Sequence, residues 1–298
     1  MISPARIGIV VTDNYTEEDP DHDTPLLVAA LLERGAEASA VVWHAGDDPA
    51  SCDLLVLRSP WDYPDRLDEF QDWLTRAAAS TRVTNPPAMV RWNLDKTYLS
   101  ELAAAGITVV PTRYCGTASE AEHALSEAPS ARVVVKPTIS AGARDTGLFE
   151  RTDPAALALA ERIVARGGVA MVQPEIAELT DGAEKALYVI EGEFTHAIAK
   201  GALLAPGGGL IGGVYVENPQ PVPATPSERA FAAEVLRAVA AITGEGMPLY
   251  ARVDTVDSAE FGLVVLEVEL IEPALNLHRA PGAIPAVADA ILRAASPA

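Results

Sequence analysis

The stretch ARVDTVDSAEFGLVVLEVELIEP, residues Ala251 to Pro273, combines two features that conflict in an ordinary strand. Its second half is rich in β-branched residues, as in a buried strand, yet it carries Glu267 and Glu269, with Glu272 close behind. Because successive side chains of a strand point to opposite faces, Glu267 and Glu269 share one face. A buried face with this many carboxylates needs a compensating positive charge.

A hairpin brings further charged residues to the same face. The first half of the stretch also alternates, and SAEFG between the two halves predicts the turn. Pairing about this turn places Asp254 opposite Glu267 and Arg252 opposite Glu269. Clustered carboxylates raise each other's pKa unless a cation neutralises them, and an all-oxygen set favours Mg²⁺ over Zn²⁺. The alternative is a solvated strand face with an Arg to Glu pair across the strands.

The composition excludes several classes of protein. A chain of 298 residues can bury a large core and divide into two or three lobes, and a net charge of -20 argues against nucleic acid or an anionic membrane as partner. Cys52 and Cys115 are too few for a disulfide scaffold or a cysteine metal site. The apolar run near Met1 is shorter than a signal-peptide core, and no later segment approaches a membrane span, so we expect a cytoplasmic protein.

The order of predicted elements indicates an α/β protein with lobes of α+β type. Residues 1–91 alternate strand and helix patterns, which predicts a parallel sheet with polar ligand-binding loops at the carboxyl ends of its strands. From residue 92 the pattern changes, and we divide the rest into lobes at 92–170 and 171–298. Within the second part we expect one helix over 93–106 and one strand over 107–115.

The motif VVVKPTISAGARDTG suggests a phosphate site. Lys136 ends a predicted strand just before a loop of small residues around Ser140, Ala141 and Gly142. Such a loop can bring backbone N–H groups to a phosphate, with the lysine as a point charge. A surface lysine before a turn is the alternative.

The segment GGGLIGG formally contains a dinucleotide-binding pattern at Gly207, Gly209 and Gly212. A helix should follow such a pattern, but VYVENPQPVP follows instead. We therefore interpret these glycines as a loop.

Other positions gain meaning only from their order along the chain. Lys96 lies in NLDKTYL at an expected helix start, Gln173 and Glu175 lie in MVQPEI, and Lys200 ends the expected hairpin strand THAIAK. Taken alone, each is typical of a solvated surface. Together with the hairpin, this order resembles the ATP-grasp superfamily, ligases that join a carboxylate to an amine through an acyl phosphate.

The resemblance covers nearly the whole chain. Its most specific part is R-x-D followed thirteen residues later by E-x-E, where many relatives have E-x-N. It implies an ATP-grasp fold preceded by a parallel α/β domain in residues 1–91. It also implies a small-molecule amino acid derivative and ATP as ligands, and a homo-oligomer.

The resemblance assigns a role to each matching position. The positions implied to bind ATP are Lys96, Lys136, Ser140, Ala141, Gly142, Gln173, Glu175, Ile176, Glu184 and Lys200. In that set the lysines would bind the phosphates, Gln173 the adenine amino group and Glu184 the ribose.

The metal and the reacting carboxylate are assigned in the same way. Asp254, Glu267 and Glu269 would hold Mg²⁺, with two ions expected and Mn²⁺ as a substitute, and Glu272 is an alternative third ligand. Arg252 and Lys200 would be catalytic, Arg252 by stabilising the oxyanion of the activated carboxylate.

Within the superfamily, TDNYTEEDPDHDTPLL, LRSPWDYP and EVELIEPALNL are similar to the O-ureido-D-serine cyclo-ligase family. That family implies ring closure of O-ureido-D-serine to D-cycloserine by an internal nitrogen, with release of ADP and phosphate. An intermolecular ligase that makes a dipeptide or amide remains the alternative. A nucleotide-binding module without catalysis is a third, which the full set of lysines and acids disfavours.

Substrate contacts are expected on the loops that follow the first and third predicted strands. The positions that we single out are Asp13, Tyr15, Asp23, Arg58 and Arg279, with His22 as a catalytic base and His278 as its competitor. A substrate ammonium would need an acid and a substrate carboxylate an arginine. Turn caps and salt bridges are the alternative for each.

Overall fold

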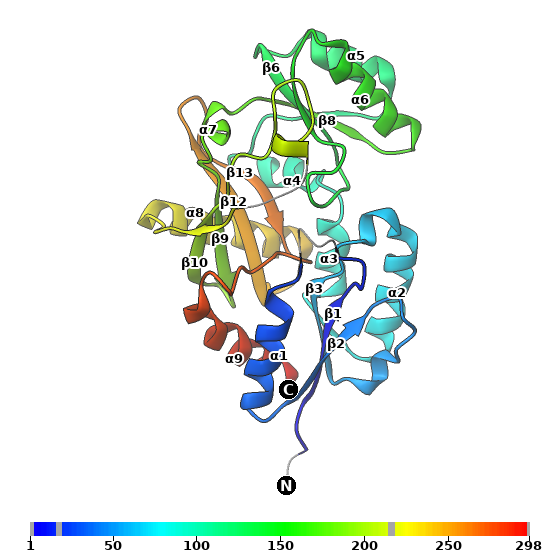
Figure 1. The fold of residues 1–298 in the computed structure, drawn as a ribbon, viewed down its shortest axis with the longest axis vertical. Coiled ribbons are helices and arrows are strands. Elements are labelled where there is room, and N and C mark those ends of the chain that lie inside the picture. The colour runs from blue at the N-terminus through cyan, green and yellow to red at the C-terminus, as the bar shows by residue number, and fades with distance from the viewer. Residues whose placement is uncertain (1–2, 16–19, 214–217, 297–298) are drawn as a thin grey trace.

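The N-terminal part of the chain forms a four-stranded parallel sheet of order β2-β1-β3-β4 (Figure 1). The computed structural model describes residues 3–15, 20–213 and 218–296. The strands are β1 Arg6–Val11, β2 Glu37–Val42, β3 Leu54–Ser59 and β4 Arg82–Thr84. The helices of this part are α1 Asp23–Glu33, α2 Leu67–Ser80 and α3 Pro87–Asn93. The predicted parallel sheet is confirmed. The segments expected to bind ligands follow the carboxyl ends of β1 and β3.

A second sheet is antiparallel and has the order β5-β8-β6-β7. Its strands are β5 Arg113–Cys115, β6 Arg132–Pro137, β7 Gly147–Glu150 and β8 Ala170–Pro174. Two helices, α5 Ala118–Ser126 and α6 Pro154–Ala165, bury their apolar side chains against it. Both helices have side-chain caps that satisfy a free backbone N–H, from Thr117 and Asp153.

The third sheet is antiparallel and has the order β11-β10-β9-β12-β13. Its strands are β9 Lys185–Ile190, β10 Glu193–Ala199, β11 Gln220–Pro221, β12 Tyr250–Ser258 and β13 Gly262–Glu269. The helices near it are α4 Tyr98–Ala104, α7 Ala177–Thr180, α8 Pro226–Thr243 and α9 Ile284–Ala295. Short 3₁₀ helices lie at η1 Pro49–Ser51, η2 Tyr63–Asp65, η3 Ile211–Gly213 and η4 Pro281–Ala283.

The register of the β12–β13 hairpin agrees with the sequence prediction. Arg252 pairs with Glu269 and Asp254 with Glu267, and the register shifts only beyond Asp254. The predicted charged face is therefore real.

Residues 93–115 differ from the prediction. The single helix expected over 93–106 is confined to α4, and residues 94–97 form turns in which the Asp95 carboxylate accepts the backbone N–H of Thr97. The single strand expected over 107–115 is confined to β5, because Val109 bridges to Val265 of β13 instead, and Pro111 has no N–H for a ladder. Tertiary pairing overrides the local pattern here.

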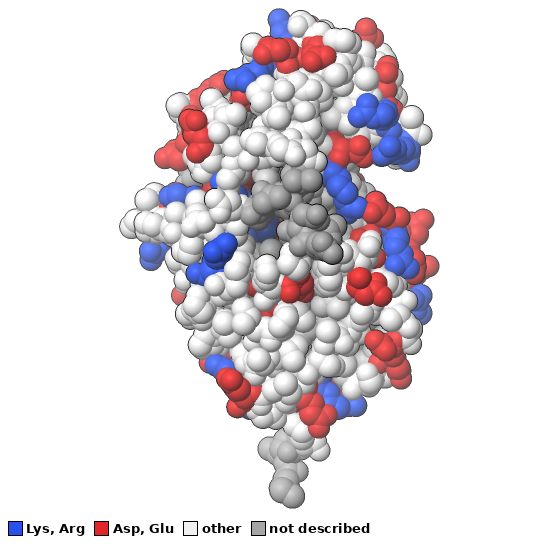
Figure 2. All heavy atoms as spheres, viewed as in Figure 1, with Lys and Arg blue, Asp and Glu red and all other residues white. Residues whose placement is uncertain are grey.

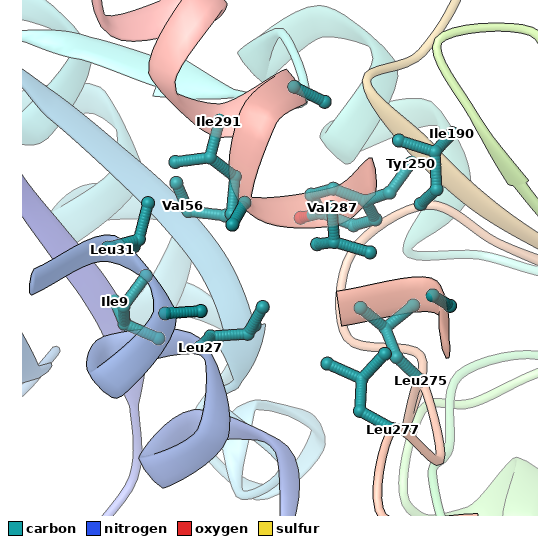
Figure 3. Close-up of a cluster of buried hydrophobic side chains, with 14 of the residues drawn as sticks. Ile9, Leu27, Leu31, Val56, Ile190, Tyr250, Leu275, Leu277, Val287 and Ile291 are labelled. Carbon is teal, nitrogen blue, oxygen red and sulfur yellow. The ribbon is translucent and has the colours of Figure 1, made fainter. Parts of the chain in front are cut away.

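One core joins the first and third sheets. Leu27 and Leu31 of α1 meet Val287 and Ile291 of α9, with Tyr250 of β12 in the same cluster (Figure 3). The division at residues 91 and 170 stays a prediction; β8 spans the second boundary and pairs with β5 and β6. Among the described residues, no helix is both long and apolar enough to cross a bilayer. On the face in Figure 2, acidic and basic side chains are interspersed.

Candidate active site

A cavity of about 670 Å³ is lined by residues of both antiparallel sheets and by residues that follow strands of the N-terminal sheet. Its wall includes Lys136 of β6, Gln173 of β8 and Glu267 of β13, together with loop residues of the N-terminal part. The predicted site residues that line it are Tyr15, Lys96, Lys136, Ser140, Ala141, Gly142, Gln173, Glu175, Ile176, Glu184, Lys200, Arg252, Glu267 and Glu269. Positions that lie far apart in the sequence thus meet at one site.

The charged face of the hairpin forms a network of ion pairs. Arg252 Nε and Nη2 each lie 2.8 Å from an Asp254 carboxylate oxygen, and Arg252 Nη2 also contacts Glu269. Lys200 Nζ lies 2.8 Å from Asp254 and 3.2 Å from Glu184. Asp254 is fully buried behind the cavity wall, whereas Glu267 and Glu269 face the cavity.

The acids of this network respond differently to burial. Burial raises the pKa of Asp254, but Arg252 and Lys200 more than compensate and hold it below its usual value. The pKa of Glu267 is likewise lowered, because Lys96 and Lys136 outweigh its burial. Burial raises the pKa of Glu269 to about 8, since Arg252 opposes it only in part and Glu267 adds negative charge. An additional cation is needed to keep Glu269 ionised at neutral pH.

Two lysines face the cavity in different ways. Lys96 Nζ lies 3.0 Å from Glu267 and donates to the Ser140 carbonyl at 2.8 Å, which ties the turn before α4 to the small-residue loop. Lys136 has no carboxylate within 4.0 Å among the described residues. Burial lowers the pKa of Lys136, which Glu267 only partly offsets. Lys136 is therefore a cation that lacks a protein anion.

The donor set fits Mg²⁺ in its chemistry. Glu267 and Glu269 present carboxylate oxygens to the cavity from one strand face, and hard cations prefer oxygen ligands. Asp254 does not line the cavity. Within the described parts of the chain, no three His, Cys, Asp or Glu side chains already enclose a metal position. Ion binding therefore requires some of these acids to exchange a lysine or arginine partner for the metal.

The opposite end of the cavity has apolar walls with a few polar groups. The apolar lining residues are Val110, Val134, Leu148, Ile176, Leu179, Leu203, Leu204 and Leu266. Gln173 donates to the Thr112 hydroxyl at 2.8 Å, and Glu175 pairs with Arg132 at 2.8 Å. An apolar slot with few fixed polar groups suits a planar heterocycle.

The glycine segment expected as a loop forms contacts near this slot. The N–H groups of Gly207 and Gly208 both donate to the Leu148 carbonyl at 2.9 Å. A Cβ on Gly208 would lie 2.5 Å from the Phe149 ring, and the φ of Gly208 is 94°. Only glycine fits this close approach.

The small-residue loop also contacts the N-terminal part of the chain. Arg144 Nε donates to the Ala141 carbonyl and Nη2 to the Trp61 carbonyl, both at 3.1 Å, and Nη1 pairs with Asp65. Both Arg144 and Asp65 line the cavity. Sequence reasoning missed this pair, because its members lie 79 residues apart and no pattern links them.

Several predicted substrate residues lie outside the cavity. Asp13 is largely exposed and lies 3.3 Å from His44 Nε2. The His22 and His278 rings lie against each other with centroids 4.6 Å apart. Neither histidine lines the cavity, and the same holds for Arg279. Of the two predicted N-terminal loops, the first contributes Asn14 and Tyr15 to the cavity.

Asp23 and Arg58 have structural contacts instead of cavity positions. The buried Asp23 carboxylate accepts the backbone N–H groups of Leu275, Asn276 and Leu277. Arg58 is 2% exposed, lies over the Tyr250 ring and donates to the Pro273 carbonyl. Both residues thus anchor the segment after β13 to the N-terminal sheet.

Replacing Asp23 by Ala should lower the free energy of unfolding by about 3 kcal/mol, since three buried N–H groups lose a charged acceptor. We expect the ATP affinity of the folded variant to stay unchanged. Thermal unfolding and nucleotide titration measure the two effects. If Asp23→Ala kept its stability but lost substrate binding, Asp23 would be a substrate-binding residue after all.

Glu272, which the sequence offers as an alternative third metal ligand, is held by residues of the N-terminal part of the chain. The Trp61 indole N–H donates to the Glu272 carbonyl oxygen at 3.0 Å, and the Tyr63 hydroxyl lies near enough to the Glu272 carboxyl to lower its pKa. Glu272 is 9% exposed and lines the cavity. Burial raises the pKa of Glu272 to about 7.

Comparisons with known proteins agree with this architecture. Residues 7–85 match the family model of the N-terminal domain of D-cycloserine synthetase DcsG. The chain is 37% identical over 266 residues to the cycloserine biosynthesis protein DcsG of Streptomyces lavendulae, covering 86% of this chain and 88% of that protein.

Solved structures show the same likeness. The crystal structure of D-cycloserine synthetase DcsG matches with a TM-score of 0.89 and 31% identity over 97% of this chain and 99% of that one. D-alanine–D-alanine ligase from Bacillus anthracis complexed with ATP matches with a TM-score of 0.66 and 14% identity, over 98% of this chain and 97% of that one. ATP-grasp ligase PsnB, complexed with a phosphomimetic variant of its minimal precursor, Mg and ADP, matches at 0.62 and 18%, over 98% of both chains. The two latter matches concern the fold.

Proposed function

Because this chain belongs to the DcsG family of ATP-grasp ligases, we propose that it closes O-ureido-D-serine to D-cycloserine in an ATP-dependent reaction. The substrate carboxylate attacks the γ-phosphate of ATP and becomes an acyl phosphate. The nitrogen bonded to oxygen then attacks the carbonyl carbon and phosphate leaves. Water cleaves the bond between this nitrogen and the carbamoyl carbon, and the carbamoyl group departs as carbon dioxide and ammonia. The observation that carries the proposal is the meeting of Lys96, Lys136 and the hairpin acids at one cavity.

The cavity offers separate environments for the two ends of ATP. The adenine occupies the apolar slot near Gln173, Glu175 and Ile176, with Glu184 at the ribose. The phosphates extend toward Lys136 and Lys96, where the small-residue loop supplies backbone N–H groups. Lys200 binds the γ-phosphate and releases part of its contact with Asp254.

The hairpin acids hold the cation that accompanies ATP. Glu267 and Glu269 would hold Mg²⁺ at the cavity, and Asp254 would support them from behind. Two bound Mg²⁺ ions would supply positive charge against the phosphates and so favour transfer of the γ-phosphate. Mn²⁺, which has similar ligand preferences, substitutes for them.

The protein residues also direct the chemistry after activation. Arg252 is held by Asp254 and Glu269, so its guanidinium is fixed before the oxyanion develops. Ring closure is intramolecular, and an internal nucleophile near the acyl phosphate has a high effective molarity. The remaining task of the protein is to exclude water.

We expect replacement of Arg144 by Ala to uncouple ATP use from ring closure. Arg144 joins the small-residue loop to Trp61 and Asp65, so its loss opens the site to water that hydrolyses the acyl phosphate. The measurement is the ratio of D-cycloserine to ADP, which should fall severalfold. Arg166→Ala is the matched control, because Arg166 pairs with Asp145 of the same loop and does not line the cavity. An unchanged ratio in Arg144→Ala would contradict this role.

The proposed function is tested by ADP release with ATP, Mg²⁺ and O-ureido-D-serine alone, with mass detection of the product. ADP together with the ring-closed product supports the cyclo-ligase. ADP that forms only after a separate amine is added would replace cyclisation by intermolecular ligation. Size-exclusion chromatography with light scattering tests the homo-oligomer that the family resemblance implies.

A further inference from the structure

Among the described residues that line the cavity, one acidic side chain has no lysine or arginine nitrogen within ion-pair distance. Seven of the lining residues carry a carboxylate: Asp62, Asp65, Glu175, Glu184, Glu267, Glu269 and Glu272. Six of them lie within 4.0 Å of a lysine or arginine nitrogen. Among the described residues, Glu272 alone has no such ion pair, and it is also 91% buried. A buried carboxylate without a cation is costly, so its partner is expected to come from the ligand.

The position of Glu272 differs from that of the two cavity-lining hairpin acids. Glu267 and Glu269 lie on β13, whereas Glu272 follows the strand and is held by the N-terminal part of the chain. The Trp61 indole fixes its carbonyl oxygen, and the Tyr63 hydroxyl lies near enough to its carboxyl to lower its pKa. Both residues come from the segment that follows β3, so this segment holds Glu272 at the cavity wall.

The surroundings of Glu272 favour an ammonium over a metal ion. The adjacent Trp61 side chain lines the cavity, and the Tyr15 ring packs edge-to-face on it at 5.6 Å between centroids. A carboxylate in a cavity that aromatic residues also line suits an alkylammonium, which can gain from both charge and ring faces. Mg²⁺ instead requires several further oxygen ligands, which these rings do not offer.

We propose that Glu272, positioned by Trp61 and Tyr63, binds the ammonium group of the amino acid substrate. This assignment rests on the proposed function, because it names the group by which that site selects its substrate. It also gives the substrate a direction in the cavity. Its ammonium end lies toward the N-terminal loops, and its carboxylate lies toward Arg252 and the phosphates.

The test pairs one substitution with one change in the substrate. ADP release is measured for the wild-type protein and for Glu272→Gln, with O-ureido-D-serine and with the same compound carrying hydrogen in place of its amino group. We expect the wild type to prefer the amine in kcat/KM by about 100-fold, as one charge-assisted hydrogen bond provides. Glu272→Gln should lose most of this preference, while the rate with the analogue, the KM for ATP and the dependence on Mg²⁺ stay unchanged.

Two further variants distinguish substrate binding from metal binding and from a general defect. Glu269→Gln should slow both compounds equally and shift the Mg²⁺ dependence. Tyr63→Phe should weaken the preference for the amine in part, because it removes only the positioning hydroxyl. If Glu272→Gln slows both compounds equally or shifts the Mg²⁺ dependence, Glu272 is not the ammonium site.

Failure of the proposed function has a different signature. In that case the wild type gives no ring-closed product from O-ureido-D-serine. The same comparison is then made with an amino acid that supports ADP release and with its counterpart lacking the amino group. A wild type that accepts both equally would overturn the assignment of Glu272, whatever the reaction.

Discussion

Replacement of Lys136 by Met should lower kcat/KM for ATP by about 100- to 1,000-fold, the usual effect of removing one charged donor from a phosphate site. Lys136 faces the cavity, and no described carboxylate lies within 4.0 Å of it. Its charge is therefore available for a phosphate.

The same substitution should not lower stability. Burial depresses the pKa of Lys136, so the folded protein bears a cost for keeping this charge. Methionine has a similar length and removes that cost, and the melting temperature should stay constant or rise. Thermal unfolding without ligand measures this effect. Loss of activity together with a large loss of stability would indicate a structural role for Lys136.

Lys185→Met is the matched control. Lys185 begins β9 and pairs with Glu228 at 2.7 Å, away from the cavity lining. We expect this variant to keep its activity and to lose a little stability, because a partly exposed ion pair contributes only modestly.

Replacement of Arg252 by Ala should lower stability, unlike replacement of Lys136 by Met. Its effect on turnover should be equally large. The guanidinium donates to Asp254 and contacts Glu269. Its loss leaves these two carboxylates with less positive charge beside them. Removing one partner of a buried ion pair costs about 3 kcal/mol or more. Turnover should fall by about 1,000-fold, since Arg252 is the group that we assign to the developing oxyanion.

A second substitution separates these two effects. In Arg252→Ala combined with Glu269→Gln, one of the uncompensated charges is gone, so part of the stability should return. Turnover should not return with it. A double-mutant cycle compares the single and double variants by chemical denaturation, which gives stability, and by ADP release, which gives turnover. Intact turnover in Arg252→Ala would remove this residue from the catalytic group.

The hairpin shows why part of the site could be predicted. The alternation of side chains along each strand and the position of the turn between the strands determine the register of a hairpin. The pairs Arg252–Glu269 and Asp254–Glu267 therefore follow from spacing alone. Lys136 and the small-residue loop were found in the same way, because a strand end followed by small residues is a local pattern. The parallel N-terminal sheet followed from alternating strands and helices.

The N-terminal substrate residues show where such reasoning stops. The sequence predicted that Tyr15, Asp23 and Arg58 lie on loops after strands. Tyr15 does line the cavity, but Asp23 begins α1 and Arg58 lies within β3, and both anchor the segment after β13. Whether a loop carboxylate meets a ligand or a buried backbone amide depends on what packs against it. That information lies more than 200 residues away in the sequence.

The sequence by itself determined the acidic strand face, its pairing with Arg252 and the order of lysines along the chain, because strand periodicity and turn chemistry act over short distances. Only the tertiary structure decided which acids keep a cation and that Glu272 lacks one. It also decided that Arg144 reaches Asp65 and that Val109 pairs with β13 rather than continuing a strand. These outcomes depend on burial and on contacts between distant segments, and both are properties of the packed chain.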